Sequence, residues 1–351
     1  MKTLVFTGGH HISSLSVALA LKAEGVNIVW IGHRHSQWAD TSDSAEYKDV
    51  VAAGIPFFDL QAGKFYQTFH PAKLIRIPWG FIQAFYYLVK IRPSGIVSFG
   101  GYLAVPVVFV GWLLGIPSIT HEQTVVAGWA NKFISLFAKK VAITWPESAS
   151  HFPKNKVVFT GLPLRPEIVS LKRKSTSPPT IYITGGKQGS HVINSAVFAS
   201  LPELTSKYRV IHQTGTSSLY GDFDSSKKFT SPNYMSFGYD SDIAIDAMSK
   251  ADIAVSRAGA HTTYELLYLG IKCVLIPIPW TSHNEQWENA NILEKNHQAI
   301  ILDQDKLSSE SLLDAIAKCV SLMPLEVIKV SDGLPKLIEL IHNTFNLEKI
   351  S

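Results

Sequence analysis

One local pattern occurs twice in this chain of 351 residues and constrains its fold more than any other feature. A short apolar strand runs into a glycine turn, and a segment of helical period follows. The strand and turn read LVFTGG at Leu4–Gly9 and YITGG at Tyr182–Gly186. Continuous apolar strands that alternate with helices are typical of parallel sheets covered on both faces. The pattern therefore predicts an α/β protein with two doubly wound domains in tandem.

The same alternation predicts further strands in each half of the chain. The glycine turn at Gly8-Gly9 leads into a helix, and Ser13 or Ser14 is expected to cap its first turn. Apolar runs between helical segments mark the expected strands, which lie at 3–6, 26–31, 95–98, 118–121 and 140–144 in the first half, and at 180–184, 209–213, 253–256, 273–276 and 299–302 in the second.

The domain boundary is expected where the strand pattern restarts. The polar run Lys172–Ser177 and the pair Pro178-Pro179 precede the first strand of the second half. We place the first domain at residues 1–163 and the second at 164–333, which suits the usual size of α/β domains. An amphipathic helix at about 334–347 has no strand after it. We expect this C-terminal segment, 334–351, to pack back on the first domain.

Composition limits the classes of protein and partner. Hydrophobic residues make up 46% and charged residues 17%, so the chain can bury cores. The two cysteines, Cys273 and Cys319, are too few for a disulfide framework and fit a reducing compartment. The first 163 residues carry 14 Lys and Arg against 8 Asp and Glu, whereas the rest carry 18 against 20. A basic first half predicts an anionic partner, but no recognised nucleic-acid module is present.

We predict that the chain binds to the surface of a membrane and does not span it. The most apolar stretch, Tyr102–Thr120, is interrupted by proline and glycine and indicates a buried helix and strand rather than a membrane span. The stretch Phe69–Arg92 mixes aromatic and basic residues, which suits an anionic bilayer interface, although a buried helix with a basic rim is the alternative. The residues expected to touch a membrane are Lys73, Arg76, Trp79, Phe81 and Phe85.

Two glycine turns are candidate anion sites. In doubly wound domains ligands bind beyond the carboxyl ends of the strands, where glycines let backbone N–H groups approach a phosphate. Gly8-Gly9 and Gly185–Gly189 both lie there and are expected to face a shared cleft. Neither has dinucleotide-fingerprint spacing, and no Walker loop is present. His10 follows the first turn as a candidate general base or phosphate ligand, with His11 beside it as an alternative.

The second half contains two further polar segments at predicted strand ends. At Ser256–Glu265, Gly259 and Ala260 leave space for a pyrophosphate at a helix start, Thr262 is a spare donor, and Glu265 can accept hydrogen bonds from ribose hydroxyls. The loop Pro277–Gln286, with Asn289 one turn later, offers groups suited to sugar hydroxyls. An ordinary capped helix and a polar surface loop are the competing interpretations.

The first half has a similar concentration of polar groups. Thr120–Thr124 ends an apolar strand with consecutive polar side chains, and Gly100-Gly101-Tyr102 is a second glycine turn. No metal is expected, because the chain lacks paired cysteines and a His-Glu-x-x-His motif, and the Asp-x-Asp pairs at 222–224 and 240–242 follow no convincing strand.

In combination these motifs resemble one family, the MurG family of UDP-N-acetylglucosamine:lipid I N-acetylglucosaminyltransferases, which has the glycosyltransferase-B fold of two Rossmann-like domains. The matching segments run in family order over most of the chain. They are Thr7–His10, Gly100–Tyr102 with Pro106, His121–Gln123 with Gly128 and Ala130–Lys132, Gly161–Arg165, Gly185–Ser190, Arg257–Ala260 with Thr262 and Glu265, and Gln286 with Asn289-Ala290.

The resemblance implies a binding role for many of the matched residues. The donor UDP-GlcNAc would be bound by Arg165, Gly185, Gly186, Lys187, Gln188, Gly189, Ser190, Gly259, Ala260, Thr262, Glu265, Gln286 and Asn289. The lipid-linked muramyl diphosphate would be bound by Thr7, Gly8, Gly9, His10, Gly100, Gly101, Tyr102, His121, Glu122, Gln123 and Thr124.

The implied reaction is an inverting transfer that needs no metal and no cofactor. His10 would remove the proton of the muramyl 4-hydroxyl as this oxygen attacks the anomeric carbon and UDP departs. The product would be lipid II, which links the chain to peptidoglycan synthesis, cell-wall biogenesis, cell shape and cell division. The protein would act peripherally at the cytoplasmic face of the bacterial cell membrane, on the anionic inner leaflet.

Several positions depart from the family pattern. Val5 and Phe6 replace two glycines of the first loop, and Ser13 stands where proline is usual. Thr124 replaces an asparagine and Glu285 a glutamine. The sequence therefore leaves two candidates for the acceptor, lipid I and another lipid-linked sugar. Two different functions stay open as well: a UDP-GlcNAc 2-epimerase, which shares the fold and the donor site, and a non-catalytic partner subunit.

Overall fold

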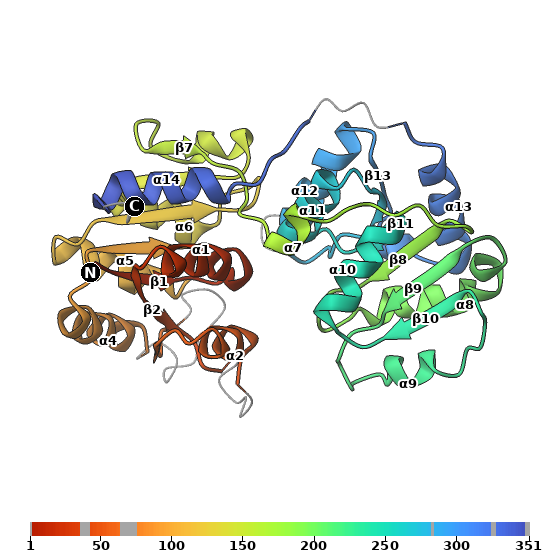
Figure 1. Ribbon diagram of the computed structural model, residues 1–351, viewed down its shortest axis with the longest axis horizontal. Coiled ribbons are helices and arrows are strands. Elements are labelled where there is room, and N and C mark those ends of the chain that lie inside the picture. The colour runs from red at the N-terminus through yellow and green to blue at the C-terminus, as the bar shows by residue number, and fades with distance from the viewer. Residues whose placement is uncertain (1, 36–42, 64–75, 282–283, 324–327, 348–351) are drawn as a thin grey trace. The chain divides into compact units, whose positions relative to one another are not determined.

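The structure is a computed structural model, which describes residues 2–35, 43–63, 76–281, 284–323 and 328–347 (Figure 1). The chain forms two compact units. The first unit consists of residues 1–165 together with 332–351, and the second of residues 166–331. The first unit is therefore built from both ends of the chain, with the second unit inserted between them. Each unit contains one parallel sheet with helices on both faces, as the alternation of strands and helices predicts.

The first sheet has seven parallel strands in the order β3-β2-β1-β4-β5-β6-β7. The direction of winding changes between β1 and β4, and such a switch point is where ligands bind in open α/β sheets. The strands are β1 Thr3–Thr7, β2 Asn27–Gly32, β3 Phe57–Asp59, β4 Gly95–Ser98, β5 Ser118–Glu122, β6 Lys140–Ile143 and β7 Val157–Phe159. The sequence predicts all of these except the two short edge strands.

Two layers of helices cover the first sheet. Because successive strand residues point to opposite faces, Leu4 and Phe6 enter one core and Val5 enters the other. Helices α1, α2 and α14 close the first core, and α4, α5 and α6 close the second. The helices of this unit are α1 His11–Ala23, α2 Ala45–Ala52, α4 Arg76–Ile91, α5 Ala104–Leu113, α6 Trp129–Phe137, the 3-10 helix η1 Pro146–His151, and α14 Leu334–Phe345.

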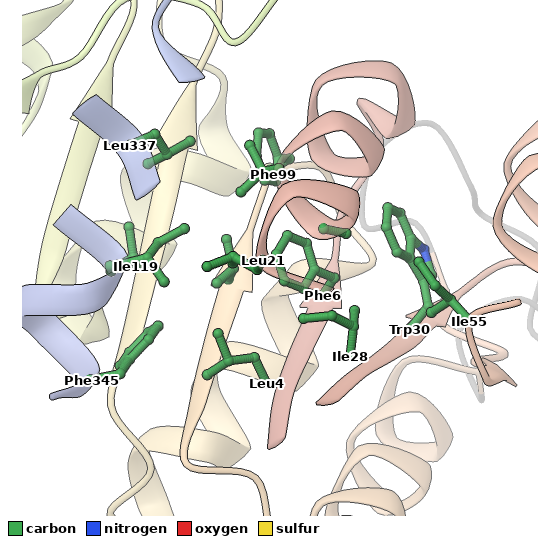
Figure 2. Packing of buried hydrophobic residues seen from close by; sticks show 14 of the residues in the cluster. Leu4, Phe6, Leu21, Ile28, Trp30, Ile55, Phe99, Ile119, Leu337 and Phe345 are labelled. Carbon is green, nitrogen blue, oxygen red and sulfur yellow. The ribbon is translucent and has the colours of Figure 1, made fainter. Parts of the chain in front are cut away.

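The C-terminal helix α14 is part of the core of the first unit. Leu337, Ile341 and Phe345 recur every four residues along one face of the helix and are buried beside Leu21 of α1 and Ile119 of β5 (Figure 2). Four-residue spacing keeps side chains on one face of a helix, which explains why this helix packs without a strand of its own.

The second sheet has six parallel strands in the order β10-β9-β8-β11-β12-β13. They are β8 Thr180–Thr184, β9 Arg209–Gln213, β10 Tyr234–Phe237, β11 Ala251–Ser256, β12 Lys272–Leu275 and β13 Ala299–Ile301. The helices are α7 Pro166–Val169, α8 His191–Lys207, α9 Asp222–Ser226, α10 Ser241–Lys250, α11 Ala260–Tyr268, α12 Glu285–Lys295, the 3-10 helix η3 Gln304–Lys306, and α13 Ser309–Val320. Here the winding changes between β8 and β11.

The prediction for the start of α1 is wrong. The helix begins at His11, directly after the glycine turn, so Ser13 and Ser14 lie inside it and are buried. Ser14 Oγ donates to the carbonyl of His10 at 3.0 Å, and Ser13 Oγ donates to the carbonyl of Pro163 at 3.1 Å. Ser13, which stands where the resembled family usually has proline, thus bonds to the chain segment that connects the first unit to the second.

Candidate functional site

Two glycine turns pack against each other at the switch point of the first unit. Gly8 has φ +130°, and a Cβ at this position would lie 2.7 Å from the backbone nitrogen of Phe99. Gly9 N donates to the carbonyl of Gly100 at 3.1 Å, and Gly100 and Gly101 have φ of +71° and +79°. Larger residues would force the two turns apart, so the glycines after β1 and β4 allow their backbones to meet.

The residues that replace family glycines before this turn are core residues here. Val5 and Phe6 are fully buried on opposite faces of β1, and the Phe6 ring stacks on Trp30 with centroids 5.9 Å apart. Their side chains point into the two cores of the unit, while Thr7, Gly8 and Gly9 form the end of the strand and the turn.

His10 occupies the N-cap position of α1 and does not cap the helix with its side chain. Burial lowers the pKa of the His10 imidazole, the nearby Glu122 carboxylate opposes this effect, and His11 adds to it. A lowered pKa keeps the imidazole neutral near pH 7, which is the form that accepts a proton. His11 instead contacts Asp49, with Nε2 and Oδ2 3.1 Å apart.

A hydrogen-bond network fixes the end of β5 to helix α6. Glu122 is buried, and its carboxylate accepts hydrogen bonds from the backbone N–H of Thr124 at 3.1 Å and from Asn131 Nδ2 at 3.0 Å. Asn131 Nδ2 also lies 3.2 Å from the carbonyl of His121, and its Oδ1 accepts from Thr120 Oγ1 at 2.7 Å. Asn131 is therefore a site residue that the sequence prediction quoted in a motif but gave no role.

The hydroxyl of Thr124 lies 2.8 Å from Glu122 Oε1 and 2.7 Å from the carbonyl of Val126. Threonine at the family's asparagine position thus completes the same network around Glu122. Next to the second glycine turn, burial raises the pKa of Tyr102 to about 12, with a further contribution from the charge of Glu46.

Several buried polar atoms near the ends of these strands lack a partner among the residues that the structure describes. Gln123 is 1% exposed, and neither its Oε1 nor its Nε2 is hydrogen-bonded. His121 Nε2 lies 3.0 Å from the carbonyl of Gly161, which leaves Nδ1 without a partner, and burial lowers the pKa of His121 to about 4. Thr7 Oγ1 and Thr144 Oγ1 are also unpaired. Such groups destabilise a fold unless a ligand or water completes them.

The glycine turn of the second unit packs on the neighbouring strand end. Gly189 has φ +84°, and a Cβ there would lie 2.0 Å from the carbonyl oxygen of Thr214. Gly186 has φ +83°, but nothing lies within 4 Å of the position of its Cβ. Gln213 Nε2 donates to the carbonyl of Gly186 at 2.9 Å. The turn is thus anchored at Gly189 and open at Gly186. Between them, Lys187 Nζ lies 5.1 Å from the ring centre of Tyr239.

Arg257 joins three strand ends of the second unit. It follows β11, donates from Nη2 to Ser190 Oγ at 2.8 Å, and donates from Nη1 to the carbonyl of Ile276 at 3.0 Å. Burial lowers the pKa of Arg257 to about 10, so the guanidinium stays charged at neutral pH. The described part of the chain gives it no carboxylate partner. The site prediction omits Arg257, although it directly precedes the Gly259 motif.

Helix α11 begins at Ala260, three residues after Arg257. Its N-cap residue Gly259 provides no side-chain cap, and the space beside its α-carbon is open. Ala260 is buried and Thr262 half-buried in the first turn, and Glu265 is only 4% exposed. The uncapped amides of a helix start favour an anion.

Two side chains of α12 form hydrogen bonds with nearby backbone groups. Gln286 Oε1 accepts from the backbone N–H of Ile278 at 3.1 Å, which orients the amide and leaves Nε2 as the donor. Asn289 Nδ2 donates to the carbonyl of Ala258 at 3.2 Å, and its buried Oδ1 has no partner among the described residues. Arg165, which was also predicted to bind the donor, is the last residue of this stretch of the first unit.

No cluster of three or more metal-ligating side chains occurs among the described residues. The Asp-x-Asp pairs have other partners. Asp240 caps α10 through the backbone N–H groups of residues 242 and 243, and Asp224 pairs with Lys227 at 2.9 Å.

Of the residues predicted to touch a membrane, Trp79 and Phe85 lie on α4 and are 48% and 52% exposed. Phe81 is half-buried and packs on Phe109 of α5 with ring centroids 5.7 Å apart. Lys73 lies outside the described residues, as does the side chain of Arg76, the first residue of α4.

Helix α5 lies beside α4, α6 lies beside α5, and both expose more apolar groups (Figure 1). Sequence reasoning missed these groups, of which the largest are Trp112, Leu113, Trp129, Phe133 and Leu136. Lys132 Nζ lies 5.5 Å from the ring centre of Trp129. No helix in the described ranges combines the length and apolar character needed to cross a membrane.

Comparison with known sequences decides the family. The profile of the glycosyltransferase family 28 N-terminal domain matches residues 5–143, and that of the family 28 C-terminal domain matches residues 180–326. This chain belongs to glycosyltransferase family 28. It is a glycosyltransferase with a MurG-like sequence, as the motif series implies.

Curated relatives of this family-28 chain match nearly its whole length. A Bacillus cereus UDP-N-acetylglucosamine--N-acetylmuramyl-(pentapeptide) pyrophosphoryl-undecaprenol N-acetylglucosamine transferase is 33% identical over 89% of this chain and 90% of its own. The Clostridium botulinum transferase of the same name is 30% identical over 97% of this chain and 99% of its own.

Solved structures show the same fold. Acinetobacter baumannii MurG superposes with a TM-score of 0.76 at 23% identity, covering 98% of this chain and 100% of that chain. The UDP-GlcNAc 2-epimerase of Neisseria meningitidis superposes with a TM-score of 0.61 at 13% identity, covering 98% and 100%. The two-sheet architecture is therefore the glycosyltransferase-B type, which transferases and epimerases share.

Proposed function

We propose that this protein transfers N-acetylglucosamine from UDP-GlcNAc to the 4-hydroxyl of a lipid-linked muramyl diphosphate, forming lipid II. The observation that carries the proposal is the match over about nine-tenths of the chain to relatives that bear the name of this transferase. The residues at the strand ends of each unit support a donor site on the second unit and an acceptor site on the first.

The donor site is proposed at the glycine turn of the second unit. An open face at Gly186 and Gly259, the start of α11 without a side-chain cap, and the cation Arg257, which has no carboxylate partner among the described residues, suit the two phosphates of UDP. Glu265 would accept the ribose hydroxyls. Gln286, whose amide nitrogen is left as a donor, would bind a hydroxyl of the sugar. The remaining proposed donor contacts are Gly185, Lys187, Gln188, Gly189, Ser190, Ala260, Thr262, Asn289 and Arg165.

The acceptor site is proposed at the paired glycine turns of the first unit. The start of α1 and the turns at Gly8–Gly9 and Gly100–Gly101 offer backbone N–H groups to the acceptor diphosphate. The unpaired amide of Gln123 and the free Nδ1 of His121 would bind hydroxyl or amide groups of the acceptor. The other contacts are Thr7, Tyr102, Glu122 and Thr124.

His10 is proposed as the base. Its lowered pKa keeps the imidazole neutral, and Glu122 stabilises the imidazolium that forms when it takes the proton of the 4-hydroxyl. The hydroxyl oxygen forms the new bond to the anomeric carbon. The bond from that carbon to the phosphate oxygen breaks, and its electron pair leaves on UDP. Arg257 and the helix start would stabilise the growing negative charge. None of these steps uses a metal or cofactor.

The acceptor is carried by a membrane lipid, and the apolar surface of α4, α5 and α6 is proposed to contact that membrane. Trp79, Phe85 and Trp112 are each about half exposed, Lys90 lies in the last turn of α4, and Lys132 of α6 lies beside the exposed ring of Trp129. Aromatic groups with basic neighbours favour an anionic interface. We therefore propose peripheral binding at the cytoplasmic face of the bacterial cell membrane.

The experiment is an assay of UDP release from UDP-GlcNAc with and without a lipid I analogue. Release that depends on the analogue, together with a lipid II product in the mass spectrum, supports the proposal. Conversion of UDP-GlcNAc to UDP-ManNAc without acceptor would establish an epimerase instead. Binding of UDP-GlcNAc without turnover of any muramyl lipid would reject the proposed transfer.

A further inference from the structure

The hydroxyl of Ser190 has an unusual partner. Ser190 is the N-cap residue of α8, a position where serine normally accepts a hydrogen bond from an amide of the first helical turn. No such bond is formed here, and Ser190 Oγ instead accepts from Arg257 Nη2 at 2.8 Å. The Ser190 hydroxyl therefore bonds to the side chain of Arg257, which follows another strand. The backbone N–H groups in the first turn of α8 receive no side-chain cap from Ser190.

Arg257 has a second fixed contact. Nη1 donates to the carbonyl of Ile276, which follows β12, at 3.0 Å. Two contacts to two nitrogens of a planar group fix the direction of its plane. Strands β8, β11 and β12 are neighbours in the sheet, so Ser190 and Ile276 hold Arg257 from the two sides of β11.

This cation has no charge partner in the described part of the unit. Arg257 is half-buried, and burial lowers its pKa to about 10, yet it stays protonated at neutral pH. A guanidinium has five N–H donors, of which Ser190 and Ile276 use two. A half-buried, preoriented cation beside two uncapped helix starts is suited to an anion with several acceptor oxygens.

We propose, on the basis of the proposed function, that Ser190 is a positioning residue that aims Arg257 at the diphosphate of the nucleotide. The serine oxygen holds Nη2 before the ligand arrives, so that the remaining N–H groups meet the phosphate oxygens without reordering a long side chain. Ser190 then contributes to nucleotide affinity through Arg257, and only for ligands that carry phosphate.

The test measures binding of UDP and of uridine by calorimetry to the full chain and to the variants Ser190→Ala, Arg257→Ala and the double variant. Because hydrogen bonds to charged groups are worth more than neutral ones, Ser190→Ala is expected to weaken UDP binding about tenfold and to leave uridine binding unchanged. In the Arg257→Ala background the same change is expected to have no further effect.

Two variants serve as controls. Ser195→Ala removes an exposed hydroxyl from the same helix α8 and is expected to bind UDP as the unaltered chain does. Ser190→Thr keeps the oxygen and is expected to retain UDP affinity, which separates loss of the hydroxyl from damage to the turn. Circular dichroism of each variant checks that it is folded.

Unchanged UDP affinity in Ser190→Ala would overturn the inference, as would equal weakening of uridine. Full additivity in the double variant would show that Ser190 does not act through Arg257 and would overturn it too. In these cases the unaltered chain still binds UDP, so the proposed transfer stands. If the unaltered chain binds no UDP, the donor site itself is wrong and the inference falls with it.

Discussion

The anchoring of the donor turn is tested by changing two glycines that have nearly the same φ but different space around the position of a Cβ. Gly186 and Gly189 both have φ near +84°, where alanine is strained by about 1–2 kcal/mol. At Gly186 an added Cβ meets nothing within 4 Å, whereas at Gly189 it would lie 2.0 Å from the carbonyl oxygen of Thr214. To reach ordinary contact at 3.4 Å, the turn would have to move by about 1.4 Å.

That movement breaks the backbone contacts of the turn. Gly189 N donates to the carbonyl of Gly186 at 3.1 Å, and the carbonyls of Lys187 and Gln188 accept from Thr216 N at 3.0 Å and Ser217 N at 3.2 Å. Losing two or three such bonds at about 1 kcal/mol each, in addition to the strain, destabilises Gly189→Ala by about 3–5 kcal/mol. For Gly186→Ala the strain alone predicts about 1–2 kcal/mol.

The assay is urea unfolding of both variants, followed by UDP titration of the folded proteins. We expect Gly189→Ala to unfold at clearly lower urea than Gly186→Ala and to lose UDP affinity. If both variants were equally stable, close approach to Thr214 would not be what requires glycine at 189, and the reasoning from the turn geometry would be refuted.

Three further outcomes are expected. Asn131→Ala removes three buried hydrogen bonds from the end of β5 and should lower the free energy of unfolding by about 3–4 kcal/mol in urea; a loss below 1 kcal/mol would contradict the network. Glu122→Gln should lower the pKa of His10 further in an NMR titration, because the carboxylate raises it, and a rise would argue against their coupling. Burial lowers the pKa of His212 to about 3, so its neutral form favours the folded state. The contribution of neutral His212 to the free energy of unfolding is fully present above about pH 6.5. It decreases by up to about 1.4 kcal/mol per pH unit as the pH falls toward 3. Unfolding of His212→Gln should depend less on pH in that window, and an identical slope would exclude His212.

The sequence predicts the two-sheet architecture because long apolar strands and glycine turns carry a strong local signal. The edge strands β3, β7 and β10 were not predicted, because each has only three or four residues and none is buried throughout, so their local signal is weak. The start of α1 is mispredicted because Ser13 and Ser14 fit a cap by residue type. Both serines are buried inside the helix. Ser13 bonds to the carbonyl of Pro163, which is far away in the sequence, and Ser14 bonds to the backbone carbonyl of His10, so residue type alone does not reveal either contact.

The proposed site, like the fold, could be predicted from the sequence only in part. Glycine turns and polar strand ends stand out in the sequence, since they interrupt apolar runs. The role of Asn131 and the pairing of Arg257 with Ser190 could not be predicted, because they join side chains from different strand ends or helices. The exposed aromatic groups of α5 and α6 were missed for a related reason. Trp112 and Trp129 read as core residues until the helix face they occupy is known.

The discontinuous first unit has a consequence for biosynthesis. Its core includes Leu337, Ile341 and Phe345, which are translated only after the whole of the inserted unit. Domains of nascent chains usually fold in order from the N-terminus. Here the inserted unit, residues 166–331, can complete its sheet before helix α14 is made, and until then α1 and α2 alone cover that face of the first sheet. The part of the chain that is made first is therefore the last to complete its core.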